Sequence, residues 1–174
     1  MDQSARFACA GTLVARREVI TAAHCIDRDT TRIVVQRFRH GDRCSPATES
    51  VGVVAVKQDG EVAVLTLGDD MFGRAPPASL ERDHADDELI AWGWGGINGA
   101  VCRVRPVVLA RLGSESCGSL RITDAPILCA KGRSDNTCVG DSGGPVVIDG
   151  MPIAITIRGL GCLPPDAGLY AVLD

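Results

Sequence analysis

Aromatic residues are scarce in this 174-residue chain: Phe, Trp and Tyr together make up 3% of the sequence, against 45% for all hydrophobic residues. The core must therefore be aliphatic, built mainly from Val, Ile, Leu and Ala. No long basic run is present and the net charge is −4, which argues against a nucleic-acid partner. No apolar run is long enough to span a bilayer, so we expect no membrane partner either.

Two further signals are missing. No CxxC pair occurs, so a zinc-ribbon site has little support. Residues 1–6 lack the apolar segment of a secretory signal peptide. The eight cysteines nevertheless favour an oxidising compartment. We therefore expect an extracellular or periplasmic protein whose export segment is absent from this sequence.

Short β-branched runs separated by turn residues are present throughout, a pattern typical of an all-β sandwich or barrel. Asp149-Gly150 is a hairpin signal, and Gly113–Leu120 gives the only helical indication. Residues 68–87 contain Pro76-Pro77 and several charges, which is typical of a connector. The expected strands are 11–14, 19–21, 32–38, 51–56, 62–67, 88–93, 101–109, 126–130, 145–148, 151–157 and 169–173.

The most informative stretch is Gly140-Asp141-Ser142-Gly143-Gly144-Pro145. Its glycines permit backbone conformations that other residues avoid and allow a substrate to approach closely. The N–H groups of Gly140 and Ser142 could then point at one spot beside the serine hydroxyl, where they would stabilise an oxyanion. The alternative is an ordinary glycine-rich turn that carries a surface serine.

A serine hydroxyl is a weak nucleophile unless a positioned base removes its proton. The segment Thr21-Ala22-Ala23-His24-Cys25 offers such a base, since histidine has the pKa best suited to the task. The alternative is a structural histidine bonded to a carbonyl near a disulfide. His40 and His84 lie in charged surroundings and are interpreted as surface residues.

Together, in this order and with an acid between them, the two segments resemble the trypsin/chymotrypsin family of serine endopeptidases. The resemblance implies an all-β fold of two packed antiparallel β-barrels, residues 1–70 and 88–174, joined by residues 71–87. His24 would lie in the first barrel and Ser142 in the second, with the active site in the cleft between them. Relative to the family, the first barrel is truncated at its N-terminal end and the C-terminal helix is missing.

The third catalytic group departs from the family pattern. Glu61-Val62-Ala63-Val64 matches the segment in which the family has an aspartate. The acid accepts a hydrogen bond from the imidazole, fixes its tautomer and stabilises the imidazolium. Glu61 can fill this role if the backbone is displaced to suit the longer side chain. Asp59 is the alternative acid, and a solvated Glu61 with a broken triad is a second alternative.

The resemblance also implies three disulfides: Cys9–Cys25, Cys117–Cys129 and Cys138–Cys162. Cys44 and Cys102 remain, and we expect them to pair.

The resemblance further places Asn136, six residues before the serine, at the base of the specificity pocket, where trypsin-like enzymes have an aspartate. The pocket walls would be Ile157-Arg158-Gly159 and the segment around Gly168. A neutral floor and open glycines predict cleavage after a neutral side chain of medium or large size. Arg158 replaces the usual aromatic residue, and its cation would favour acidic residues upstream of the cut.

Members of the family are made as zymogens and become active when a new N-terminal Ile or Val pairs with the aspartate before the serine, here Asp141. Nothing like Ile-Val-Gly-Gly precedes Cys9, so we expect the sequence to be part of a longer protein. The alternative is a truncated member of the family with impaired activity. A buried Asp141 without a cation would be unfavourable.

The predicted function is peptide-bond hydrolysis through an acyl-enzyme, with no metal and no organic cofactor. The expected partners are peptide or protein substrates and protein inhibitors. The competing hypothesis is a non-catalytic pseudoprotease that uses the same fold as a binding module.

Overall fold

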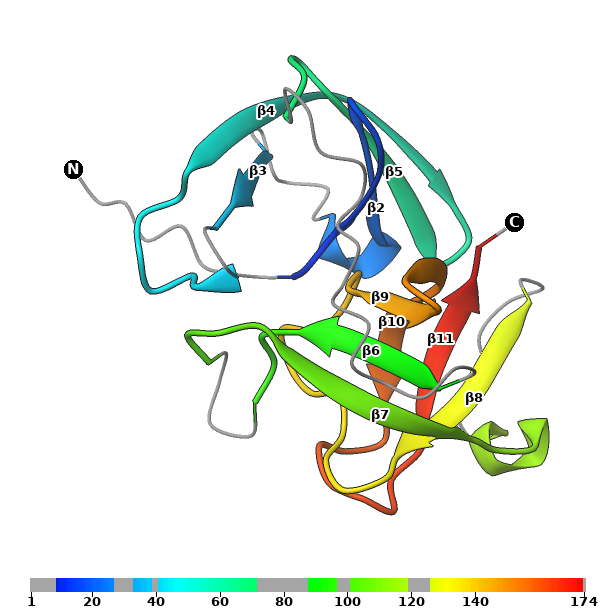
Figure 1. Cartoon of the computed structure of the whole chain (residues 1–174). Helices are drawn as coiled ribbons and strands as arrows, with labels where there is room; N and C mark the ends of the chain where they lie inside the picture. The colour runs from blue at the N-terminus through cyan, green and yellow to red at the C-terminus, as the bar shows by residue number, and fades with distance from the viewer. Residues whose placement is uncertain are drawn as a thin grey trace.

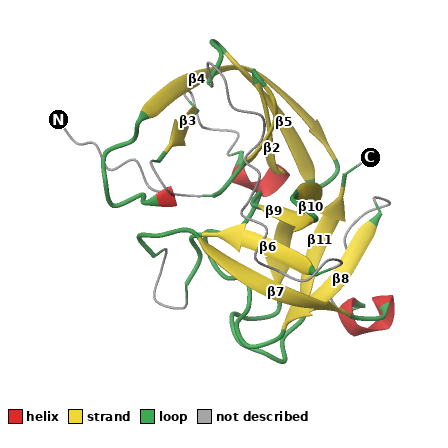
Figure 2. Cartoon of the chain, in the orientation of Figure 1, coloured by secondary structure: helices red, strands yellow, loops and turns green. Residues whose placement is uncertain are grey.

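The structure, a computed structural model, describes residues 9–26, 33–38, 41–71, 88–96, 101–118 and 126–173. Its strands divide between two sheets, which lie one above the other in Figure 1. Helix is confined to short turns in these ranges, among them η1 (Ala23–Cys25) and η3 (Ser114–Cys117), and is drawn red in Figure 2. Neither these turns nor any other described segment forms a helix that could cross a bilayer.

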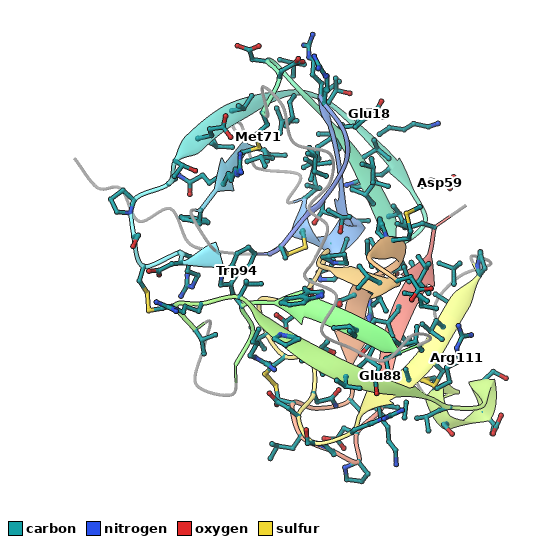
Figure 3. All side chains as sticks on the ribbon, in the orientation of Figure 1. Glu18, Asp59, Met71, Glu88, Trp94 and Arg111 are labelled. Atoms are coloured by element: carbon teal, nitrogen blue, oxygen red, sulfur yellow. A yellow bond between two sulfur atoms is a disulfide. The ribbon has the colours of Figure 1, made fainter. Side chains whose placement is uncertain are left out.

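The first half of the chain forms a curled five-stranded sheet in the order β1-β2-β5-β4-β3. Gly60, with φ of 55°, turns the β4–β5 hairpin in a conformation that favours glycine. Alternate residues of β5 are buried, so this strand presents one apolar face inward. The inner cluster is Val19, Leu65, Leu67 and Met71, the last labelled inside the curl in Figure 3. The strands are β1 (Thr12–Ala15), β2 (Glu18–Ala22), β3 (Val34–Arg37), β4 (Glu49–Asp59) and β5 (Val62–Leu67).

The second half closes into a six-stranded antiparallel barrel in the order β10-β11-β8-β7-β6-β9. Asp149 and Gly150, both with positive φ, turn the β9–β10 hairpin. The core is aliphatic except for Tyr170, which is fully buried. The strands are β6 (Leu89–Gly93), β7 (Arg105–Arg111), β8 (Ile127–Gly132), β9 (Pro145–Ile148), β10 (Met151–Gly159) and β11 (Gly168–Val172).

The two halves share a third apolar cluster where β2 meets β10. Ala22 from the first sheet packs there with Ile155, Ile157 and Ala171 from the barrel. Backbone hydrogen bonding continues this seam, because the Ala10 N–H donates to the Ser142 carbonyl at 2.8 Å. The serine turn is therefore held by both halves of the molecule.

A second join lies at the edge of the two sheets. The Cys44–Cys102 disulfide connects residues far apart in the sequence, and Asp42 and Arg103 form a β-bridge beside it. The Trp94 indole N–H donates to the Gly41 carbonyl at 2.6 Å, and Figure 3 labels Trp94 at this boundary. These contacts fix the β3–β4 side of the first sheet against the barrel.

The structure confirms the all-β fold and all four expected disulfides. The first half is a curled half-barrel and not a closed barrel in the described residues. Strand β7 begins at Arg105, whereas the sequence predicted a start at residue 101. The reason is that residues 101–104 bond instead to the segment near Gly41, where the Val104 N–H donates to the Gly41 carbonyl. The expected surface histidines, His40 and His84, and most of the connector lie outside the described residues.

Candidate active site

His24 and Ser142 meet across the seam. His24 lies in η1, directly after β2, where the Ala23 N–H donates to the Glu61 carbonyl at 2.8 Å. The imidazole Nε2 is 3.0 Å from the Ser142 hydroxyl oxygen, within hydrogen-bonding distance. The Ser142 hydroxyl also lies 3.3 Å from the Ile157 carbonyl. This pairing has the geometry that proton transfer from the serine to the histidine requires.

The surroundings of His24 favour its neutral form. The ring is open to solvent on one side, yet partial burial lowers the pKa of His24 and outweighs the other effects. The Glu61 carboxylate acts in the opposite direction and raises this pKa, while the Arg158 guanidinium lowers it further. A neutral imidazole can accept a proton, so the site suits general-base chemistry at neutral pH.

Glu61 acts on His24 through its charge. Within the described residues, no hydrogen bond joins the Glu61 carboxylate to the imidazole. Among the residues that the structure describes, this carboxylate pairs with Arg158, whose Nη2 lies 3.8 Å from Oε2. The alternative acid, Asp59, is exposed at the end of β4 and is labelled on the outer surface in Figure 3. The position of Glu61 beside the ring therefore agrees with its predicted location, while its orienting role stays a prediction.

The serine turn depends on glycine at two positions. Gly140 has φ of 101° and Gly143 has φ of 82°, both in a region that L side chains rarely adopt. The turn is fixed internally, because the Asp141 N–H donates to the Cys138 carbonyl and the Gly144 N–H to the Asp141 carbonyl. The N–H groups of Gly140 and Ser142 have no acceptor among the described residues. They are thus available to bind an oxyanion beside the hydroxyl.

Asn136 is a buried structural amide. Its side-chain oxygen accepts hydrogen bonds from the backbone N–H groups of Thr137 and Gly132, at 3.0 and 3.3 Å. Its amide nitrogen donates to the carbonyls of Asp166 and Gly161, at 2.9 and 3.3 Å. As a neutral amide, Asn136 adds no charge to the site. Because backbone groups occupy both ends of the amide, it fixes the local backbone.

Two of the predicted pocket glycines border tight spaces. A methyl group at Gly168 would lie 2.8 Å from the Tyr170 hydroxyl, and one at Gly159 would lie 3.3 Å from the Gly161 carbonyl. Burial raises the pKa of Tyr170 to about 12, so its hydroxyl stays neutral, and it is hydrogen-bonded to Thr137. Glycine at position 168 therefore leaves room for this neutral phenol.

The carboxylate of Asp141 points inward from the serine turn. Its side chain is 2% exposed and accepts hydrogen bonds from the N–H groups of Gly95 and Cys138. Burial raises the pKa of Asp141, while these two amides and the Arg105 guanidinium lower it. Nη2 of Arg105 is 3.7 Å from Oδ2 of Asp141. Groups of the chain itself therefore compensate the carboxylate in part, while burial still leaves the pKa of Asp141 above its ordinary value.

One cluster could suggest a metal centre. Ligand atoms of Cys9, His24 and Cys25 lie within 4.8 Å of one another. The two sulfurs form a disulfide, however, so neither offers the thiolate that metal binding requires.

The family model described as Trypsin matches residues 1–173. The chain belongs to the trypsin family. Serine protease Hayan of Drosophila melanogaster is 27% identical, over 96% of this chain but 33% of its own length. Trypsin-3 of Salmo salar is 29% identical, over 92% of this chain and 75% of its own length. Neuropsin, a serine protease expressed in the limbic system of mouse brain, superposes with a TM-score of 0.76 over 95% of this chain and 83% of its own. It is 24% identical, so this last comparison supports the fold alone.

In this member of the trypsin family, the structure brings together most of the residues that the sequence singled out. His24, Ser142, Ile157, Arg158 and Glu61 surround one site. Sequence reasoning missed Arg105, the cation beside Asp141. The residue carries no local signal, because its partner lies on a distant turn that only the folded barrel brings close.

Proposed function

We propose that this chain is a serine endopeptidase that hydrolyses peptide bonds through an acyl-enzyme. The observation that carries the proposal is the 3.0 Å contact between His24 Nε2 and the Ser142 hydroxyl, beside two unbonded N–H groups. A nucleophile, a base and an oxyanion site are the minimum set for acyl transfer. Membership of the trypsin family supports the same chemistry.

Each step has a residue of this chain to perform it. His24 would take the hydroxyl proton while the Ser142 oxygen attacks the scissile carbonyl. The N–H groups of Gly140 and Ser142 would hold the resulting oxyanion, worth roughly 3–4 kcal/mol for one donor in measured cases. His24 would then protonate the leaving amine, and water would hydrolyse the acyl-enzyme. Glu61 would stabilise the imidazolium through its charge.

The neutral amide of Asn136 supports the proposed cleavage after a neutral side chain of medium or large size, whereas the tight spaces at Gly159 and Gly168 do not indicate the size. Asn136 is neutral and fully bonded, and the acid next to it, Asp135, is 53% exposed and paired with Arg105. Neither of these two residues therefore offers a free carboxylate to receive a lysine or arginine. Arg158, beside Ile157, would favour an acidic residue upstream of the cut.

Four disulfides are typical of an oxidising compartment, so we place the enzyme outside the cell or in a periplasm. Protein or peptide substrates and protein inhibitors are the partners that this proposal implies.

A fluorescent phosphonate probe tests the catalytic proposal, because it reacts only with an activated serine. We expect labelling of the wild-type chain, loss of labelling in Ser142→Ala and a strong reduction in His24→Ala. Ser50→Ala, an exposed serine on β4, is the matched control and should label normally. A folded chain that fails to label would contradict the proposal.

The second candidate is a pseudoprotease that binds peptides without cleaving them. It is favoured by one observation: the Glu61 carboxylate contacts Arg158 and does not bond to the imidazole. Under this hypothesis a peptide would bind the folded chain, while neither labelling nor turnover would be detected.

A further inference from the structure

The Asp141 carboxylate is a buried anion directly beside the nucleophile. Its two oxygens receive the N–H groups of Gly95 and Cys138, at 2.5 and 2.9 Å. Two amides bring partial charges only, so a full negative charge at this depth still requires a cation.

The space around the carboxylate admits no other side chain from the adjoining strand. A Cβ atom at Gly93 would lie 1.8 Å from one carboxylate oxygen, and a Cβ at Gly95 would lie 2.5 Å from the other. The two glycines of the Gly93-Trp94-Gly95 segment therefore leave the space that the Asp141 carboxylate fills.

Arg105 supplies the cation and is itself held firmly. Its Nε donates to the Gly95 carbonyl at 2.9 Å, and its Nη2 donates to the Asn136 carbonyl at 3.0 Å. Nη1 pairs with Asp135 at 2.5 Å, and Nη2 lies 3.7 Å from Asp141. With 21% of its side chain exposed, the guanidinium is fixed from several sides at the first residue of β7.

Asp141 sits between Gly140 and Ser142, whose N–H groups have no acceptor among the described residues and are proposed to hold the oxyanion. Its own N–H and carbonyl are both used inside the turn, bonded to Cys138 and Gly144. If the carboxylate left this space through a movement of the turn itself, the flanking peptide planes would move with it. The Gly140 peptide, with φ of 101°, would be displaced first because glycine offers the least resistance to rotation.

We propose that Arg105 is a positioning residue that keeps Asp141 charged and inward, so that the oxyanion site forms without an ammonium group from a newly cut N-terminus. The proposal rests on the serine endopeptidase proposed above and adds to it a route of activation. The family resemblance implies pairing of the aspartate at this position with a new terminal amine. In this chain an internal guanidinium takes that place.

The first test measures the rate of phosphonate labelling in Arg105→Met and Arg105→Lys. We expect the methionine variant to label about 100-fold more slowly or worse, the effect of losing one oxyanion donor. Lysine keeps the positive charge but lacks the planar guanidinium with its several N–H donors, so labelling should return to within about tenfold of the wild-type rate. Arg133→Met, which removes an exposed pair with Glu88, is the control and should label at the wild-type rate.

The second test needs no variant. An α-amino-selective aldehyde blocks the terminal amine of the wild-type chain, and labelling should be unchanged. Loss of labelling after blocking would overturn the proposal, as would wild-type labelling in Arg105→Met.

A third measurement separates this proposal from the proposed function. Hydrogen exchange of the turn containing Gly143 and Gly144, whose N–H groups are bonded, reports its order whether or not Ser142 reacts. Exchange should accelerate in Arg105→Met and stay slow in Arg133→Met and in the blocked chain. Unchanged exchange in Arg105→Met would refute the role of Arg105, whereas absent wild-type labelling with this exchange pattern would refute the peptidase alone.

Discussion

His24 is flanked by two opposite charges, and each should shift its titration in a defined direction. Arg158 lowers the pKa of His24, so Arg158→Gln should raise this pKa and move the acid limb of the labelling profile to higher pH. Glu61 raises the pKa, so Glu61→Gln should move the same limb to lower pH. The measurement is the rate of phosphonate labelling against pH. Arg111→Gln, an exposed change on β7, is the control, and shifts in the same direction for both variants would contradict the assignment.

Asn136 should resist replacement by the aspartate of trypsin-like enzymes. A carboxylate cannot donate to the Gly161 and Asp166 carbonyls, so Asn136→Asp leaves two acceptors facing a buried charge. We expect the free energy of unfolding in urea to fall by about 1–3 kcal/mol or more. Gln58→Glu makes the same chemical change on the exposed side of β4 and should alter stability by less than about 0.5 kcal/mol. Equal effects of the two changes would show that the amide bonds of Asn136 contribute little.

At the level of strands, β6 ends at Gly93, where the absence of a side chain leaves space for the Asp141 carboxylate. Gly93→Ala would place a methyl group against the buried Asp141 carboxylate. We expect a loss of about 1–3 kcal/mol in unfolding free energy, typical of overpacking, together with slower labelling of Ser142. Gly52→Ala, on β4, is the control, because a Cβ there meets nothing within 4 Å. A Gly93→Ala variant that keeps wild-type stability and labelling would mean that the carboxylate can move freely.

Local sequence patterns predicted the positions of most strands. The run at residues 62–67 alternates buried and partly buried positions, and the structure has β5 over the same span. Gly113–Leu120 contains η3 as the helical indication predicted. The predicted strands differ from the observed strands at their ends, because pairing with the neighbouring strand determines where a strand begins and stops. Strand β4 extends to Asp59 because it pairs with β5 as far as Val62, a contact that the sequence of β4 does not reveal.

The candidate site was predictable where a motif carries its own chemistry. The segments around His24 and Ser142 are such motifs. The Arg105–Asp141 pair and the Glu61–Arg158 pair are not, since each joins elements that become neighbours only after the sheets pack. Electrostatic partners chosen by tertiary packing have no local signature.

For the whole molecule, the Cys44–Cys102 disulfide should contribute more stability than its exposed position suggests. It spans 58 residues, whereas Cys9–Cys25 spans 16. The chain-entropy relation gives about 4 kcal/mol for the longer loop and about 3 kcal/mol for the shorter. The double variant Cys44→Ser/Cys102→Ser should therefore lower the free energy of unfolding in denaturant more than Cys9→Ser/Cys25→Ser. The reverse order would show that the two halves dock without the covalent link.

The hydrogen bond between His24 and Ser142 has one end on each half of the molecule. This 3.0 Å hydrogen bond is sensitive to the relative position of the two halves, because a displacement of one half by about 1 Å would stretch it beyond hydrogen-bonding range. Reactivity then depends on the stiffness of the seam between the halves more than on the total free energy of folding. If the two halves were intact but slightly misaligned, they would retain nearly all their strands and disulfides, and Ser142 would still be unreactive.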